Sequence, residues 1–212
     1  LCLYTASIQD AVELAGGHGS AATGELDKLN DLLLPLVKGY CSEKVYELLS
    51  LSLQTYGGSG YCMDYPIEQY IRDQKIDTLY EGTTHIQALD LFFRKVMRDM
   101  GQTLRGLLGQ VEATLASVDP NGPLGVEHAA LSRALGDLQG IYMAMLGKVQ
   151  ESVYHVGFQG NRILFATAEV VIGWLLLKQG IVAAAKRETA TERDRDFYQG
   201  KLAAIRFYAR NV

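Results

Sequence analysis

The chain has 212 residues, of which 48% are hydrophobic and 21% are charged, and its formal net charge is −4. These proportions are ordinary for a soluble globular protein, and the length suits one generous domain or two small ones. The acidic balance argues against a general nucleic-acid-binding surface, which needs a basic field, so no nucleic-acid partner is expected.

Apolar residues recur at three- and four-residue steps through most of the chain, and glycine and proline interrupt them only rarely. This pattern predicts an all-α protein. Residues 1–15 are typical of the end of a helix, and residues 16–25 of a flexible connection. A second helix is predicted from Glu25 to about Thr55, and Pro35 within it could kink or divide it.

A third helix is predicted to start at Thr83 and to continue through residue 118. The strongest break in the chain follows at Asp119–Gly125, where prolines and glycines are concentrated. Three further helices are predicted beyond it, over about Val126–His155, Arg162–Lys186 and Glu192–Asn211. The last of these begins with acidic residues and ends with basic ones, as suits a helix dipole.

Cysteine usage and hydropathy bear on where the protein works. Cys2, Cys41 and Cys62 are scattered without paired spacing, so neither a disulfide framework nor a zinc site is expected, and a reducing, cytoplasmic compartment is favoured. The most apolar stretch, Val170–Leu177, is much shorter than the roughly 20 residues of a membrane span, so a buried core helix is predicted instead. No signal peptide is visible at Leu1, and the chain is expected to be a piece of a longer protein.

Residues 54–82 interrupt the helical pattern and carry most of the unusual polar residues. Gly57, Gly58 and Gly60 end an apolar helical run, as glycines that accept a positive φ commonly do. Further on, Glu81 stands alone, and Thr83 occupies the head of the next helix, where a hydroxyl suits an N-cap. The pattern predicts a non-helical crossing that brings a carboxylate close to a helix N-terminus.

Four pieces of this region, in this order and spacing, resemble the C-terminal helical domain of the acyl-CoA dehydrogenases. They are QxxGG (Gln54–Gly58), GYxxxYPxE (Gly60–Glu68), the pair Arg72-Asp73, and YEGTTHIQ (Tyr80–Gln87). The resemblance covers roughly residues 1–110, and the remainder is similar to the extra helical segment of larger bacterial members. It implies an antiparallel helical bundle over residues 1–118, followed by an accessory helical domain over residues 119–212.

The resemblance implies a flavin enzyme that removes two hydrogens from the α and β carbons of an acyl-CoA in fatty-acid β-oxidation, with FAD as cofactor. Glu81 would take the α-proton, and its own N–H, together with a flavin ribityl hydroxyl, would bind the thioester oxygen. A free carboxylate with a pKa near ~4.3 is a weak base for this proton, so desolvation on substrate binding must raise its basicity. Tyr80 would form a wall of the acyl pocket, and Gly82 would let the backbone come close to the ligand.

The resemblance also assigns residues to the flavin nucleotide. Thr83 and His85 fall where family members contact it, and helix N-termini favour phosphate groups. Gln54, Gly57 and Gly58 correspond to a segment that contacts the adenosine-diphosphate part of the FAD held by a neighbouring subunit, which requires a homo-oligomer, a dimer or a tetramer. Without the resemblance, Glu81 would be a solvated loop residue, Thr83 an N-cap, His85 an exposed first-turn residue, and Gln54–Gly58 a helix end with a tight turn.

The partners implied are the N-terminal and middle domains of the same enzyme and an electron-transferring flavoprotein. The stretch alone is therefore expected to be inactive, because those domains cradle the flavin ring. Two alternatives stay open: an acyl-CoA oxidase, which would produce hydrogen peroxide, and a non-catalytic helical subunit of the same fold. Retention of Glu81 within an intact YEGT segment argues against the second alternative.

Overall fold

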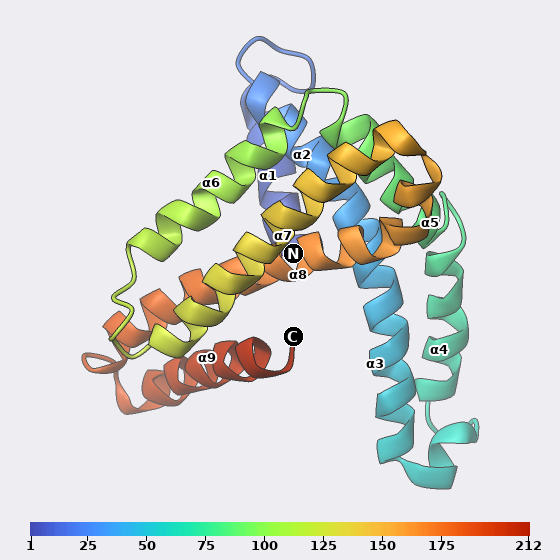
Figure 1. The fold of residues 1–212 in the computed structure, drawn as a ribbon. Coiled ribbons are helices and arrows are strands. Elements are labelled where there is room, and N and C mark those ends of the chain that lie inside the picture. Colours follow the sequence, from blue (N-terminus) through green and yellow to red (C-terminus); the bar gives the residue numbers. More distant parts are fainter. The chain divides into compact units, whose positions relative to one another are not determined.

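A computed structural model describes residues 1–212 and contains only helices and connecting turns, which confirms the all-α fold (Figure 1). Short π-helical segments and 3₁₀ turns join some of the α-helices. The α-helices are α1 (Cys2–Leu14), α2 (Gly24–Leu36), α3 (Ser42–Thr55), α4 (Ile67–Lys75), α5 (Thr84–Leu89), α6 (Gln102–Ala116), α7 (Gly125–Glu151), α8 (Tyr154–Arg187) and α9 (Glu192–Asn211). The π-helical segments are η1 (Val37–Cys41) and η4 (Asp90–Val96), and the 3₁₀ turns are η2 (Gly57–Tyr61) and η3 (Ile76–Thr78).

The helices form two compact units. The first unit comprises residues 2–103 with 148–165, and the second comprises residues 104–147 with 166–212. The division predicted from the sequence, into residues 1–118 and 119–212, follows chain order and stays a prediction.

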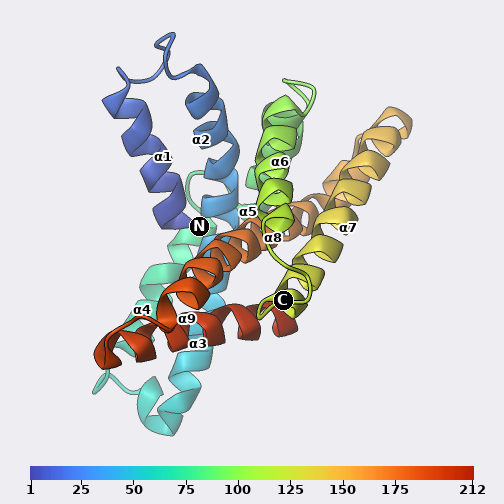
Figure 2. The same cartoon turned by 90° about the vertical axis from the view of Figure 1, so that its left-hand side faces the viewer.

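In the first unit, α1 packs beside α2, and α3 packs beside α4 (Figures 1 and 2). The helix predicted from Glu25 to Thr55 is one continuous helical stretch formed by α2, η1 and α3. Pro35 lies in the last turn of α2, and the π-helical segment η1 follows directly. Because proline lacks an N–H and its ring crowds the preceding turn, a local change of helical spacing keeps the chain helical instead of ending it.

The prediction of one unbroken helix from Thr83 to residue 118 is wrong. The chain turns at Met97–Gly101, where Met100 and Gly101 have φ angles of +55° and +74°. The amide of Gly101 donates to the carbonyl of Val96 (2.8 Å) and closes the preceding helical segment. Asp99 then accepts hydrogen bonds from the amide and hydroxyl of Thr103 in the first turn of α6, as a capping side chain does.

The second unit draws on α6, α7, α8 and α9, whose buried residues are mainly apolar. Its largest fully buried side chain, Trp174, donates its indole N–H to the Thr114 hydroxyl (2.7 Å). The predicted bounds of α9 are confirmed, and its N-cap is Thr191, whose hydroxyl accepts from the Asp194 amide. The gap predicted between His155 and Arg162 is wrong, because α8 already begins at Tyr154.

By length and composition alone, α8 could cross a membrane. Buried core helices of soluble proteins share that property, and three of the large apolar side chains of α8, Val171, Trp174 and Leu177, are at most 1% exposed within the protein. The apolar run of α8 therefore contributes to the interior of the second unit.

Candidate functional site

The loop between η3 and α5 carries Tyr80, Glu81, Gly82 and Thr83, and it is non-helical. The non-helical crossing predicted over residues 54–82 is correct for this loop but wrong for its middle part, where α4 forms a regular helix after Pro66. Glu81 has a φ of +56° and Gly82 a φ of +93°. A positive φ is routine for glycine but uncommon for a residue with a side chain, so the backbone at Glu81 must be held by its surroundings. Strained backbone of this kind is often found at functional sites.

Two side chains from other elements hold the loop. The ammonium group of Lys38, on η1, donates to the carbonyl oxygens of Asp77 and Gly82, each at 2.7 Å. The side-chain amide nitrogen of Gln87, on α5, donates to the main-chain carbonyl oxygen of Glu81 at 2.9 Å. Three main-chain carbonyls between residues 77 and 82 are thus satisfied by side chains that come from outside the loop.

A partly buried hydrogen bond joins the start of α5 to the start of α3. Thr84 is only 5% exposed, and its hydroxyl donates to a carboxylate oxygen of Glu43 at 2.5 Å. Because a carboxylate is a strong acceptor in a partly buried setting, this contact fixes the first turn of α5 relative to α3. The loop that precedes α5 is therefore anchored at its far end as well.

Glu81 and Tyr80 line a hollow of about 270 Å³ whose other walls come from η1, α3 and the end of α4 with η3. Lys38, Cys41 and Asp77 are among its other lining residues. Burial, and to a lesser extent the neighbouring Cys2 thiol, raise the pKa of Cys41 to about 12. Cys41 is therefore a neutral wall of the hollow, not a nucleophile, because only a thiolate reacts readily.

Thr83 stands at the N-cap of α5, as predicted, with an extended backbone. Its hydroxyl makes no capping hydrogen bond to the helix, so the expected N-cap contact is absent. His85 is exposed in the first turn of α5, and its ring lies beside Gly160 near the start of α8. Both residues lie at the N-terminal end of α5, the end that follows Glu81.

Gln54, Gly57 and Gly58 lie at the opposite end of α3 from this hollow, and all three are exposed. Gly57 has a φ of +59°, as predicted for a glycine that ends a helix, and a Cβ at either glycine would meet no atom within 4 Å. Ser42 lines the hollow and Gln54 is twelve residues further along α3, so roughly 18 Å of helix separate them. The structure thus brings Tyr80, Glu81, Gly82, Thr83 and His85 together and leaves Gln54, Gly57 and Gly58 apart from them within one chain.

The roles of Lys38, Glu43 and Gln87 were not predicted from the sequence. For Lys38 the sequence did offer an indication: a lysine that lies between apolar stretches of a helix needs a hydrogen-bond acceptor for its ammonium group. Its two acceptors are main-chain oxygens 39 and 44 residues away, which no local pattern reveals.

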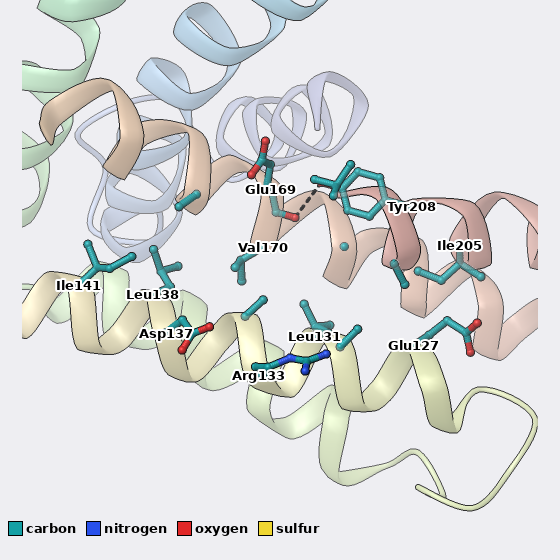
Figure 3. A pocket seen from close by; sticks show the side chains of 16 residues that line it. Glu127, Leu131, Arg133, Asp137, Leu138, Ile141, Glu169, Val170, Ile205 and Tyr208 are labelled. Atoms are coloured by element: carbon teal, nitrogen blue, oxygen red, sulfur yellow. Dashed lines mark hydrogen bonds between the residues drawn. The ribbon is translucent and has the colours of Figure 1, made fainter.

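A second hollow, of about 350 Å³, lies within the second unit between α7, α8 and α9 (Figure 3). Apolar residues such as Leu131, Leu138 and Val170 form most of it, and the Tyr208 hydroxyl beside it donates to the carbonyl oxygen of Glu169 (3.0 Å). None of the site residues predicted from the sequence lies in it.

Two family models match the chain. The model described as "Acetyl-CoA dehydrogenase C-terminal like" matches residues 107–212, and the model described as "Acyl-CoA dehydrogenase, C-terminal domain" matches residues 20–94. The second match includes the Tyr80–Thr83 loop, and the first begins within α6.

Curated relatives match over most of the chain. The broad-specificity linear acyl-CoA dehydrogenase FadE5 of Mycobacterium tuberculosis is 48% identical over 100% of this chain and 36% of its own length. The 3-methylmercaptopropionyl-CoA dehydrogenase of Ruegeria pomeroyi is 34% identical over 95% of this chain and 34% of its own length. The chain therefore spans about a third of the length of the curated relatives that it matches.

Among solved structures, ACDH-11 of Caenorhabditis elegans in complex with C11-CoA superposes with a TM-score of 0.69. The match covers 94% of this chain and 32% of that chain at 21% identity, and at this identity it shows a shared fold.

Proposed function

The chain belongs to the acyl-CoA dehydrogenase family, and on this premise we propose that it is the C-terminal part of an enzyme that dehydrogenates acyl-CoA thioesters, with Glu81 as the α-proton base. The observation that carries the proposal is the loop of Tyr80–Thr83. It holds an exposed carboxylate in a left-handed backbone conformation, at the wall of a hollow and directly before a helix. A carboxylate on an anchored but exposed loop is available to a ligand that covers it.

The proton transfer requires a change in the surroundings of Glu81. In the chain alone Glu81 is exposed to water, which stabilises the charged carboxylate. A bound thioester and the remaining domains would exclude that water and make the carboxylate a stronger base towards the α-proton. The amide of Glu81 would donate to the thioester oxygen, where negative charge develops as the proton leaves, a contribution of a few kcal/mol, or about 10²-fold in rate, for one such donor.

The residues assigned to FAD fit a dinucleotide in two places. Gly57 and Gly58 present exposed backbone with open space where a side chain would be, which permits close approach of a nucleotide. Thr83 has a hydroxyl free of any helix cap, and His85 lies two residues further on, in the first turn of α5. When bound, FAD would accept the β-hydrogen as hydride. The residues of this chain would bind its nucleotide portion and position Glu81 beside the substrate.

The separation of Gln54–Gly58 from Glu81 supports an assembly of at least two subunits, because one chain presents the two sets at opposite ends of α3. We propose a homo-oligomer in which Gln54, Gly57 and Gly58 contact the FAD of a neighbouring subunit. The other proposed partners are the N-terminal and middle domains of the same enzyme and an electron-transferring flavoprotein, in a cytoplasmic fatty-acid β-oxidation pathway.

The test replaces Glu81 by Gln in the full-length enzyme. Glu81→Gln keeps the shape of the side chain and removes its basicity, so exchange of the substrate α-proton with solvent should fall by about 10³-fold or more. Flavin content should stay unchanged. The matched control is Glu47→Gln, which neutralises an exposed carboxylate on α3 that pairs only with Lys44 (3.0 Å). Exchange within threefold of the wild type in Glu81→Gln would place the base elsewhere.

A further inference from the structure

Lys38 occupies a position that no local sequence pattern explains. It lies on η1, and its ammonium group donates to the carbonyl of Asp77, before Glu81, and to the carbonyl of Gly82, directly after it. The same ammonium group is 5.8 Å from the centre of the Tyr80 ring. One cation thus holds the backbone on both sides of the proposed base, and charged donors make stronger hydrogen bonds than neutral ones.

The loop needs such an anchor. Glu81 keeps a φ of +56°, a conformation that costs of order 1–3 kcal/mol for a residue with a side chain and persists only where neighbours enforce it. Gln87 supplies a third hydrogen bond, to the carbonyl of Glu81 itself. Because both acceptors of Lys38 are main-chain oxygens, the contact sets the path of the backbone and does not neutralise a carboxylate.

The segment that carries Lys38 is itself held rigidly within the first unit. Gly39 packs so closely on α8 that a Cβ there would lie 2.9 Å from a methyl carbon of Leu164. The next residue, Tyr40, places its ring edge-on to Phe165, with centroids 5.4 Å apart. The lysine therefore projects from a fixed support, which is what a positioning group requires.

We propose that Lys38 is the positioning residue of the Glu81 loop: its two hydrogen bonds fix the carboxylate and the amide of Glu81 in the geometry that proton abstraction needs. The proposal rests on the proposed function of Glu81. Lys38 acts through the loop backbone and is not itself a catalytic residue. A displacement of about 1 Å in a reacting group can lower a rate by about 10²-fold, so the loss of two anchors should be visible in the chemical step.

The experiment uses the full-length enzyme with Lys38→Met and Lys38→Arg. Methionine keeps an unbranched apolar stem, one atom shorter than lysine, and donates no hydrogen bond, whereas arginine keeps the charge and can reach two acceptors. The control is Lys44→Met, because Lys44 also lies over a tyrosine ring, 5.9 Å from the centre of Tyr40, but makes only a surface contact with Glu47. Turnover is measured per bound flavin with butyryl-CoA or palmitoyl-CoA, whichever the wild type oxidises.

Lys38→Met should lower kcat and α-proton exchange by about 10- to 100-fold, with KM changed by less than about threefold. Where Lys38→Met lowers kcat by a hundredfold, Lys38→Arg should lower it by about tenfold at most. The kcat of Lys44→Met should stay within about twofold of the wild type. A purely structural role would lower flavin content or stability and leave the kcat of the flavin-loaded enzyme unchanged. That result would overturn the proposal.

Glu81→Gln is measured in the same series to separate two kinds of failure. If Glu81→Gln retains exchange, the assignment of the base is wrong, and with it the role of Lys38. If Glu81→Gln abolishes exchange and Lys38→Met retains the kcat of the wild type, only the positioning role is wrong. Should Lys38→Met not bind flavin, Lys38→Leu, which also donates no hydrogen bond, replaces it under the same criteria, and failure of both to bind flavin would assign Lys38 to stability and overturn the proposal.

Discussion

The two units of the chain differ in how regular their backbone is. In the first unit, helices are interrupted by two π-helical segments and two 3₁₀ turns, and every residue with a positive φ lies there, between residues 16 and 101. The second unit draws on the longest helices of the chain, and no residue of it has a positive φ. Irregular backbone is thus concentrated in the unit that carries the proposed base.

Polar side chains also have different tasks in the two units. In the first, Lys38 and Gln87 donate to loop carbonyls and hold a conformation that the loop would not keep by itself. In the second, hydroxyl and indole groups satisfy one another where helices pack, as in the bond between Tyr142 and Thr167 (2.9 Å). Burial raises the pKa of Tyr142 to about 12, so this hydroxyl stays neutral and serves packing. The comparison suggests that changes in the second unit affect stability, whereas changes in the first affect chemistry.

The largest effect on stability is expected for Trp174→Ala in the second unit. Trp174 is 1% exposed, and its loss would leave a large cavity and the Thr114 hydroxyl without its donor, so the free energy of unfolding of the full-length enzyme should fall by about 3–5 kcal/mol. Trp174→Phe, which keeps an aromatic ring, should cost about 1–2 kcal/mol. Urea unfolding followed by circular dichroism measures both.

Activity in these variants should respond differently from stability. Below the unfolding transition, kcat per bound flavin should stay within about twofold of the wild type in both, because Trp174 packs within the second unit, whereas the Glu81 loop belongs to the first. A loss greater than tenfold in a folded, flavin-loaded Trp174→Ala enzyme would show that the second unit acts on the chemistry and would break the comparison.

A pair of glycine-to-alanine changes tests the contrast directly. Gly82 has a φ of +93°, and an added Cβ would lie 3.1 Å from a side-chain carbon of Ile86 and 3.2 Å from the side-chain amide nitrogen of Gln87. Gly82→Ala should therefore displace the loop and lower kcat by about 100-fold, equivalent to about 2.7 kcal/mol on the barrier.

Its partner is Gly136→Ala in the second unit. Gly136 is exposed within α7, and an added Cβ would meet no atom within 4 Å. Alanine should raise the free energy of unfolding by about 0.5–1 kcal/mol and leave kcat unchanged. Steady-state kinetics and urea unfolding of both variants give the comparison. Equal effects on kcat would remove the distinction between the units.

A modest, pH-dependent loss of stability is expected for Asp99→Asn, at the turn between η4 and α6. Partial burial tends to raise the pKa of Asp99, but hydrogen bonds from Thr103 and from the amides of Gly101 and Gln102 outweigh it and lower the pKa below its ordinary value. A carboxyl whose pKa is depressed by folding contributes stability above its unfolded pKa and loses it as the pH falls through the folded pKa.

Asp99→Asn should therefore cost about 1 kcal/mol at pH 7. The difference in unfolding free energy between wild type and variant should shrink as the pH is lowered below about 4, where the wild-type carboxyl takes up a proton. Urea unfolding at a series of pH values measures it. A difference that does not change with pH would show that the charge of Asp99 does not contribute to the turn.

Prediction from sequence succeeded where local chemistry and long-range packing agree. The bounds of α9 were predicted because an acidic first turn and a basic last turn both indicate one helix, and in the structure a Thr191 N-cap agrees with them. The turn at Met97–Gly101 was not predicted, because apolar residues recur at helical spacing on both sides of it and the pattern therefore resembles one unbroken helix. Met100 in a left-handed conformation has no sequence signature, since methionine normally favours a helix.

For the candidate site, too, some features follow from the sequence and others only from the tertiary structure. The sequence alone determined the all-α class, the position of the non-helical loop and the glycine at Gly82, because periodicity, helix-ending residues and backbone freedom are local properties. Only the tertiary structure decided how Glu81 is held, since Lys38 reaches the loop across 44 residues of chain, and how far Gln54–Gly58 lie from it. Those arrangements depend on which helices pack together, and packing is a property of the whole folded chain.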